Sequence, residues 1–95
     1  MKKGYIIAHV HVHDPAGFED YLKIGLPSLD RFGGRSLVLG GQYTTLEGQE
    51  KERHVVIEFD SYQQALDCYN SSEYQAAADL RKRYADTDLV VVEGT

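Results

Sequence analysis

The order strand, helix, strand occurs twice in succession in this sequence, and this order constrains the fold more than any other feature. Apolar residues that alternate with polar ones predict half-buried strands. The four predicted strands are Tyr5–His13, Ser36–Leu46, His54–Asp60 and Leu89–Glu93. Apolar residues recur at helical spacing between the first and second strands and between the third and fourth. The predicted order is therefore βαββαβ.

The first helix has clear end signals in the sequence. Asp14-Pro15 predicts its start, because Asp accepts hydrogen bonds from free amides and Pro suits the first turn. Gly33-Gly34 predicts its end, with one glycine in a left-handed conformation. Pro27 removes a backbone donor inside the helix, so we expect a kink or a break near Ile24–Leu26.

The second helical region is predicted in two pieces. Ser61 and Gln64 form the pattern of a capping box at its start, and Asn70–Ser72 breaks it. Ser72 and Gln75 offer a second capping box, so a third helical piece is predicted over about Glu73 to Tyr84.

Right-handed crossovers interleave the two halves into one four-stranded antiparallel sheet with the first and third strands at its centre. Residues 1–95 are therefore predicted to form one α+β domain of ferredoxin-like topology. Gly40-Gly41 suggests a bulge or bend in the second strand. Turns are predicted at Gly48–Glu52, which makes a hairpin of the second and third strands, and at Asp86–Asp88.

Alternation along the strands assigns two sets of side chains to opposite faces of the sheet. The apolar set, expected beneath the helices, is Ile6, Ala8, Val10, Val12, Val55, Ile57, Phe59, Val90 and Val92. The mixed set, expected on the open face, is Ile7, His9, His11, Arg35, Leu37, Leu39, Val56, Glu58, Leu89 and Val91. Large exposed apolar patches usually mark interfaces, so we expect a homodimer in which two sheets pack face to face as a barrel.

Charge and composition argue against some classes of binding partner. A net charge of −5 argues against nucleic acid and against anionic membrane surfaces. No stretch approaches the ~20 apolar residues of a membrane span. The single cysteine, Cys68, is typical of a reducing compartment and is predicted to be a small buried residue rather than a nucleophile. We therefore expect a soluble, cytoplasmic protein.

A series of short motifs runs through nearly the whole chain. It includes Gly4-Tyr5-Ile6-Ile7-Ala8, Asp14-Pro15, Gly33-Gly34-Arg35, Gly40-Gly41, Arg53 with Val55-Val56-Ile57-Glu58-Phe59, Glu73-Tyr74-Gln75, Leu80-Arg81 and Val92-Glu93-Gly94. As an ensemble, the series resembles the bacterial family labelled domain of unknown function 1330. The resemblance implies a dimeric α/β barrel and a homodimer with no established activity. The wider group includes small monooxygenases, haem-degrading enzymes and muconolactone isomerases, so the fold alone decides little about function.

Three histidines at alternate positions, His9, His11 and His13, are the sharpest chemical motif. Alternate residues share one face of a strand roughly 6.6–6.8 Å apart, a spacing at which two imidazoles can hold one metal ion. Glu58 on the neighbouring strand would be the carboxylate ligand. A metal site normally needs three or four converging ligands. We therefore favour ordinary polar histidines, and we expect no metal and no other cofactor.

Two further clusters are candidate ligand-binding groups. On the open face, Arg35, Glu58, His9 and His11 could bind a small acid or phenol, or form an ion-pair network that fixes the dimer. On the helices, Tyr74 and Arg81 lie two turns apart on one side, with Tyr69 nearby. These helical residues could form a pocket wall, or pack on the sheet with a salt bridge. Tyr21 is predicted as a core residue, with pocket donor as the alternative.

The leading functional prediction is a small-molecule binding protein for a small organic acid or phenol. Its predicted ligand-binding residues are His9, Arg35, Glu58, Tyr69, Tyr74 and Arg81. If the protein is an enzyme, His9 or Glu58 would transfer protons while Arg35 holds charge. The alternatives are a cofactor-independent monooxygenase- or isomerase-like enzyme, by analogy with relatives, and a structural or regulatory dimer without a ligand. Such a scaffold would have its lumen filled by Leu37, Leu39 and Val91.

Overall fold

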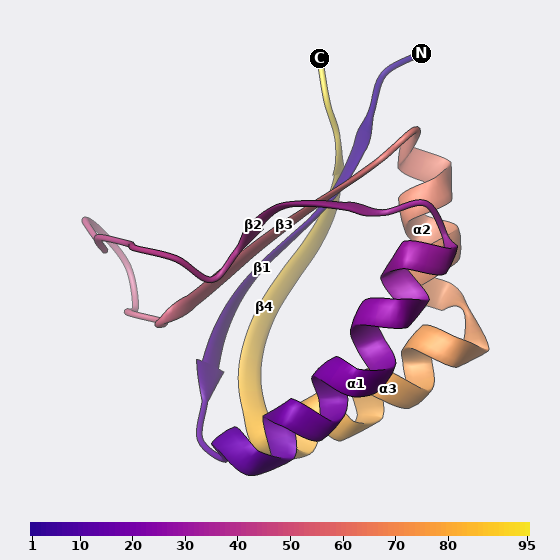
Figure 1. Cartoon of the computed structure of the whole chain (residues 1–95). Helices are drawn as coiled ribbons and strands as arrows, with labels where there is room; N and C mark the ends of the chain where they lie inside the picture. The colour runs from indigo at the N-terminus through magenta and orange to yellow at the C-terminus, as the bar shows by residue number, and fades with distance from the viewer.

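The computed structural model describes all 95 residues, and its three helices lie on one side of a four-stranded sheet (Figure 1). The elements are β1 (Gly4–Val12), α1 (Pro15–Arg31), β2 (Arg35–Leu39), β3 (Arg53–Phe59), α2 (Tyr62–Asn70), α3 (Ser72–Tyr84) and β4 (Ala85–Glu93). The strand order is β2-β3-β1-β4, and every neighbouring pair is antiparallel. The predicted α+β ferredoxin-like fold is therefore confirmed, with β1 and β3 at the centre.

Helix α1 begins and ends where the sequence predicts. The Asp14 side chain accepts a hydrogen bond from the Gly17 N–H at 3.1 Å, and Gly33 adopts a left-handed φ of 80° beyond the last turn. The helix is not broken near Ile24–Leu26, because it continues through Pro27 to Arg31. Pro27 lies on the exposed side of the helix, where water can satisfy the carbonyl left without a donor.

The caps of the other helices differ slightly from the prediction. Ser61 accepts from the Gln64 N–H at 3.1 Å as expected, but the Gln64 side chain donates to the Phe32 carbonyl at 2.7 Å instead of completing the box. This bond connects α2 to the end of α1. The N-cap of α3 is Ser71, which accepts from the Tyr74 N–H at 3.1 Å, so the predicted Ser72 cap was one residue late.

Strand β2 is much shorter than predicted, ending at Leu39 instead of Leu46. Gly40 and Gly41 have φ values of 79° and 97°, and two successive left-handed residues cannot continue a strand. The irregularity within β2 lies earlier, where the register shifts between Ser36 and Val38. The connection to β3 is an irregular loop that extends away from the helices (Figure 1).

Strand β4 is longer than predicted, and the turn at Asp86–Asp88 is wrong. These residues pair with β1, with Asp86 opposite His11 and Asp88 opposite His9. The Tyr84 carbonyl accepts from the backbone N–H groups of His13 and Asp14 at 3.0 and 3.2 Å. These bonds join the end of α3 directly to the sheet, so no separate turn is needed.

In β4 and in part of β2, side chains lie on the opposite face of the sheet from the one predicted. In β4, Leu89 is opposite Ala8 and Val91 is opposite Ile6, so both face the helices while Val90 and Val92 face outward. The segment Leu89–Val92 is apolar at every position. Its sequence therefore does not show which residues face the helices and which face outward.

In β2, the bulge at Leu37 reverses the predicted alternation. Leu39 lies opposite Val55 on the helix side, and Val38 lies opposite Val56 on the open face.

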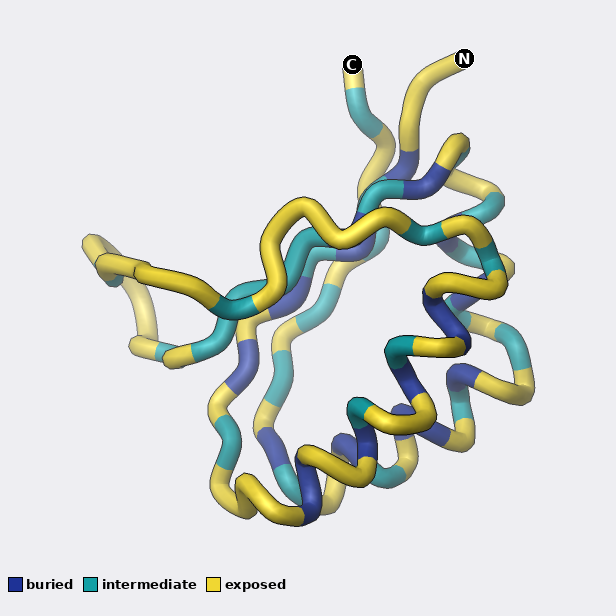
Figure 2. The backbone as a smooth tube through the Cα atoms, viewed as in Figure 1, coloured by how far each residue is buried: buried dark blue, intermediate teal, exposed yellow.

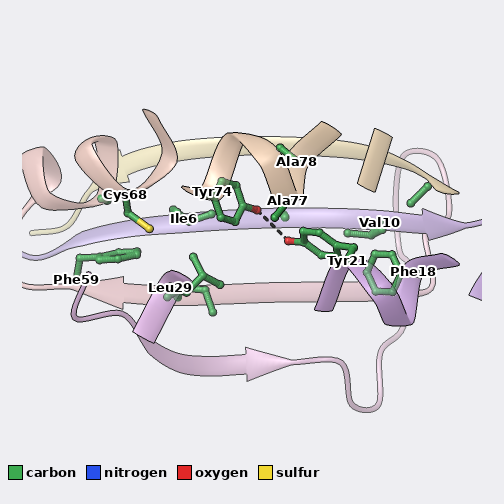
Figure 3. Packing of buried hydrophobic residues seen from close by; sticks show 14 residues of the cluster. Ile6, Val10, Phe18, Tyr21, Leu29, Phe59, Cys68, Tyr74, Ala77 and Ala78 are labelled. Carbon is green, nitrogen blue, oxygen red and sulfur yellow. Dashed lines mark hydrogen bonds between the residues drawn. The ribbon is translucent and has the colours of Figure 1, made fainter. Parts of the chain in front are cut away.

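The hydrophobic core lies between the sheet and the helices (Figures 2 and 3). Phe59 of β3, Cys68 of α2 and Ala77 of α3 are among its fully buried residues, and the burial of Cys68 agrees with the prediction. The opposite face remains open: Val38 is 39%, Val90 51% and Val92 40% exposed. None of the three helices combines the length and the apolar character needed to cross a membrane.

Candidate functional site

A small cavity lies between the sheet and helices α1 and α3. Its volume is about 30 Å³, room for about two water molecules. Hydrophobic side chains provide 13 of its 16 lining residues, so the few polar groups determine what it can bind. Ala8, between Ile6 and Val10 on β1, contributes only a methyl group to the cavity floor.

Three polar side chains meet at this cavity. The hydroxyl oxygens of Tyr21 and Tyr74 lie 2.9 Å apart, and Figure 3 shows this contact between α1 and α3. Arg81 Nη1 donates to the Tyr74 hydroxyl at 2.9 Å, and the Arg81 guanidinium carbon lies 5.8 Å from the centre of the Tyr21 ring. Arg81 is only 5% exposed and forms no salt bridge. The predicted salt bridge from Arg81 to an acidic residue is therefore absent.

Burial determines the protonation of this cluster. Desolvation is the main reason that the pKa of Tyr74 is raised well above its ordinary value, so the phenol is neutral near pH 7. Burial alone would lower the pKa of Arg81, but the oxygens of Tyr74 and Tyr21 raise it above its ordinary value. The cavity wall therefore carries a permanent positive charge without a counter-ion.

Three residues that line this cavity have a buried polar atom without a partner. Arg81 Nε, Arg53 Nε and Thr87 Oγ1 are buried without a hydrogen-bond partner, and all three residues line the cavity. An unmet buried donor or acceptor costs about 1–3 kcal/mol. No aspartate or glutamate lines the cavity. Its polar groups therefore fit a ligand with acceptor atoms, preferably an anion.

The six predicted ligand-binding residues lie in two groups on opposite faces of the sheet. Tyr74 and Arg81 line the cavity, and the Tyr69 ring packs behind them, 5.7 Å from the Tyr74 ring centre. His9, Arg35 and Glu58 lie on the open face, so the structure does not bring all six residues into one pocket.

Arg35 and Glu58 belong to an ion-pair network on the open face. Arg35 donates to Glu58 at 3.1 Å and to Asp60 at 3.0 Å, and the Tyr5 hydroxyl donates to Glu58 at 3.2 Å. The hydrogen bond from Arg35 is the main reason that the pKa of Asp60 is lowered. Both acidic groups therefore already have a cationic partner.

The histidines of β1 do not converge with Glu58. His9 Nδ1 lies 2.7 Å from His54 Nδ1, and His11 Nδ1 lies 3.1 Å from Glu52 Oε2. Glu58 is instead opposite Tyr5 in the sheet. The structure has no group of three or more His, Cys, Asp or Glu residues placed to hold a metal ion, and the less favoured alternative of His9, His11 and Glu58 as ligands does not form.

Two cavity residues were missed by the sequence analysis. Arg53 has the same parity as Val55, Ile57 and Phe59, so its place beneath the helices was available from the pattern. Thr87 was hidden by the incorrect turn at Asp86–Asp88.

The sheet order and the single helical layer define a ferredoxin-like α+β protein, a class whose solved members include dimers. Within that class, the chain belongs to the family described as Domain of unknown function (DUF1330), whose model matches residues 3–95. The resemblance stated above is thus confirmed. None of the curated proteins matches this sequence.

Solved structures share the fold at low sequence identity. A protein of unknown function from Rhodopseudomonas palustris, RPA0582, is 16% identical with a TM-score of 0.77, over 99% of this chain and 83% of that one. SnoaB, a cofactor-independent oxygenase from Streptomyces nogalater, is 12% identical with a TM-score of 0.64, over 100% and 95%. A dimeric ferredoxin-like protein of unknown function from Bacteroides fragilis is 11% identical with a TM-score of 0.63, over 96% and 95%.

Proposed function

We propose that this protein binds a small organic anion, a carboxylate or a phenolate, in the cavity between the sheet and helices α1 and α3. Arg81, with the Tyr21–Tyr74 pair, is the recognition group. The observation that carries the proposal is an arginine only 5% exposed, with its Nε unpartnered, in a cavity without any carboxylate. The apolar lining suits the hydrocarbon part of such a ligand.

The unpaired charge of Arg81 affects both the stability of the empty protein and its affinity for an anion. A buried charge without a counter-ion costs several kcal/mol, so Arg81 reduces the stability of the empty protein. Hydrogen bonds to charged groups contribute about 1.5–3 kcal/mol each, so an anion at Arg81 would offset much of that cost. A group that is costly in the empty protein and satisfied by a ligand is typical of a binding site rather than of a core.

Binding of small acids to matched variants tests this proposal. Calorimetric titration with butyrate and benzoate should show binding to the wild type and to Arg83→Met, an exposed control on the same helix. Arg81→Met should weaken binding at least about tenfold, because a charge-assisted bond is lost. Equal affinity in the wild type and Arg81→Met, or no binding of either acid, would contradict the proposal.

We also propose that the open face of the sheet packs against a second copy of the chain. An apolar row of Val38, Val56, Ile7 and Val90 crosses all four strands on that face. The solved neighbours described as dimeric support a dimer, and the apolar row supports this face as its contact. The Arg35–Glu58 and His9–His54 contacts would then lie on either side of the apolar row and fix the register of the two sheets.

Sedimentation tests the assembly separately from ligand binding. The wild type should sediment as a dimer at micromolar concentration. Val90→Glu should sediment as a monomer, since it places a charge in the contact. Lys23→Glu, at an exposed position of α1, should remain dimeric. A stable wild-type monomer would rule out the face-to-face pairing.

The second candidate function is cofactor-independent oxygenase activity, which rests on the fold shared with SnoaB. In this chain, the tyrosines and Arg81 would have to serve such a reaction, since His9 and Glu58 lie on the other face. Oxygen consumption with a phenolic acid that binds the cavity separates the two functions: turnover that requires Arg81 supports an enzyme, and binding without turnover supports a binding protein.

A further inference from the structure

We propose that the ligand of this cavity carries two anionic groups, that Arg53 and Thr87 bind the second one, and that short dicarboxylates are the preferred class. The inference rests on the proposed function, because Arg81 is taken to bind the first group. It goes further by assigning a second recognition group and the charge of the ligand.

Arg53 and Thr87 lie in one row of the sheet beneath the helices. Val10 on β1 is opposite Arg53 of β3 on one side and opposite Thr87 of β4 on the other. Neighbouring strands are about 4.8 Å apart, so the backbones at Arg53 and Thr87 are separated by about 10 Å. Both side chains line the cavity, and each has a buried polar atom without a partner.

A short series of aromatic contacts connects Arg53 with the Arg81 cluster. The Arg53 guanidinium carbon lies 5.3 Å from the centre of the Phe18 ring. The Phe18 ring is 5.2 Å from the Tyr21 ring, which in turn faces Arg81 at 5.8 Å. The two guanidiniums therefore border the same cavity at the two ends of a Phe18–Tyr21 wall.

The arginines of this chain differ in their partners. The surface residues Arg31 and Arg35 are paired, the first with Glu73 and the second with Glu58 and Asp60. Arg53 and Arg81, like the exposed Arg83, have no acidic partner within 4.0 Å, but only Arg53 and Arg81 have a buried Nε. The chain has 15 acidic residues against 10 basic ones, so a shortage of carboxylates does not explain the unpaired arginines.

The carboxylate next to Arg53 in the sequence is already engaged. Glu52 accepts from the Val12 N–H at 2.7 Å and contacts His11 at 3.1 Å. Burial alone would raise the pKa of Glu52, but these hydrogen bonds lower it below its ordinary value. Glu52 is therefore held by β1 and leaves the Arg53 guanidinium without a counter-ion.

The guanidiniums of Arg81 and Arg53 border a cavity without a carboxylate, and two positive charges match a ligand with two negative charges. A monoanion at Arg81 would leave the half-buried Arg53 guanidinium without a counter-ion and its buried Nε without a hydrogen-bond partner. The apolar lining between them fits a short hydrocarbon link.

The small volume of the cavity indicates the direction in which the ligand extends. Room for about two water molecules is about the room for one carboxylate group. Arg53, Phe18 and Leu22 line both the cavity and a hollow on the protein surface. A ligand anchored at Arg81 would therefore extend to Arg53, at the border of this hollow, whose other lining residues include Glu19 and Glu52.

Calorimetric titration with matched acids tests the inference. Succinate is compared with butyrate and glutarate with valerate, because each pair has the same carbon number and differs by one carboxylate. In the wild type, each dicarboxylate should bind at least about tenfold more tightly than its partner acid, as expected for one further charge-assisted contact. Arg53→Met should remove this preference while monocarboxylate binding persists, and Arg53→Lys should restore part of it.

Two more variants separate the inference from misfolding. Thr87→Val keeps the side-chain shape and should weaken dicarboxylate binding several-fold without changing monocarboxylate binding. Arg83→Met on the exposed side of α3 should change neither. Equal affinity for the two acids of each pair in the wild type, or an unchanged preference in Arg53→Met, overturns the second anion group. In that case the proposed function still stands if Arg81→Met abolishes binding of both acids. If none of the four acids binds the wild type, the proposed function and the inference are both overturned.

Discussion

The guanidinium of Arg81 donates to the hydroxyl of Tyr74 at 2.9 Å, and no acidic residue lies within 4.0 Å of it. A neutral phenol satisfies one N–H group but does not neutralise the charge. Arginine is almost never buried unless it is paired, because a buried charge without a counter-ion is costly. The Arg81–Tyr74 contact therefore links the packing of α3 to the proposed binding of an anion.

Replacing Arg81 with methionine separates stability from binding. We expect Arg81→Met to leave the free energy of unfolding of the empty protein unchanged or to raise it by about 1–3 kcal/mol, because a buried unpaired charge is replaced by an apolar side chain. Urea denaturation without added acids measures this change. A loss of stability greater than about 2 kcal/mol would mean that Arg81 is a structural residue.

The hydroxyl pair of Tyr21 and Tyr74 should act as one unit. Tyr21→Phe removes one contact, whereas Tyr74→Phe removes the contacts to both Tyr21 and Arg81. We expect losses of about 1 kcal/mol and about 2 kcal/mol, and a double variant that loses less than their sum. Chemical denaturation of the three variants measures this coupling, and strict additivity would show that the hydroxyls are energetically independent.

Cys68 predicts a change of stability at alkaline pH. Burial is the main reason that the pKa of the Cys68 thiol is raised to about 11 from an ordinary value of 9.0. The unfolded chain releases this proton at lower pH than the folded one, so the contribution is intact below about pH 9 and is lost as the pH rises toward 11.

The stability difference between the wild type and Cys68→Ala should therefore shrink between about pH 8 and about pH 10.5. Thermal denaturation of both proteins at the two pH values measures it, and the comparison cancels groups common to both, such as Tyr74. A constant difference would show that the thiol ionises equally in the folded and unfolded states.

The open-face network predicts a titration change at a single carboxyl group. The hydrogen bond from Arg35 is the largest cause of the lowered pKa of Asp60, followed by the charge of Arg35 and by Lys3. In Arg35→Gln, the pKa of Asp60 should rise most of the way to its ordinary value, with Lys3 retaining the rest. The stabilisation by this carboxylate is present above its ordinary pKa and is lost as the pH falls through the lowered value. Carbon-13 NMR titration of the Asp60 carboxyl measures this change, and an unchanged pKa would show that Arg35 does not hold it in solution.

The sequence predicts the sheet well where each strand has one apolar and one polar face. β1 alternates Ile6, Ala8 and Val10 against His9 and His11, so its facing is correct. β4 is apolar at four successive positions, and its facing depends on pairing with β1, which no local pattern contains. In β2, a one-residue bulge at Leu37 reverses the faces that follow it.

The candidate site is only partly accessible from the sequence, for a different reason. Tyr74 and Arg81 share one helix face, so their spacing places them together. Arg53 and Thr87 come together only through their common neighbour Val10. Whether an arginine has an acidic partner also depends on three-dimensional distances. Arg35 pairs with Glu58 on the neighbouring strand, whereas Arg81 has no acidic partner.

NMR spectra of the arginine side chains test the central claim most directly, because each Nε–H group gives its own nitrogen-15 signal. On titration with glutarate, the Nε–H signals of Arg81 and Arg53 should shift and become protected from exchange with water, while that of exposed Arg83 stays unchanged. Signals of Arg81 and Arg53 that do not respond at saturating glutarate, or that respond no more than that of Arg83, would contradict the account.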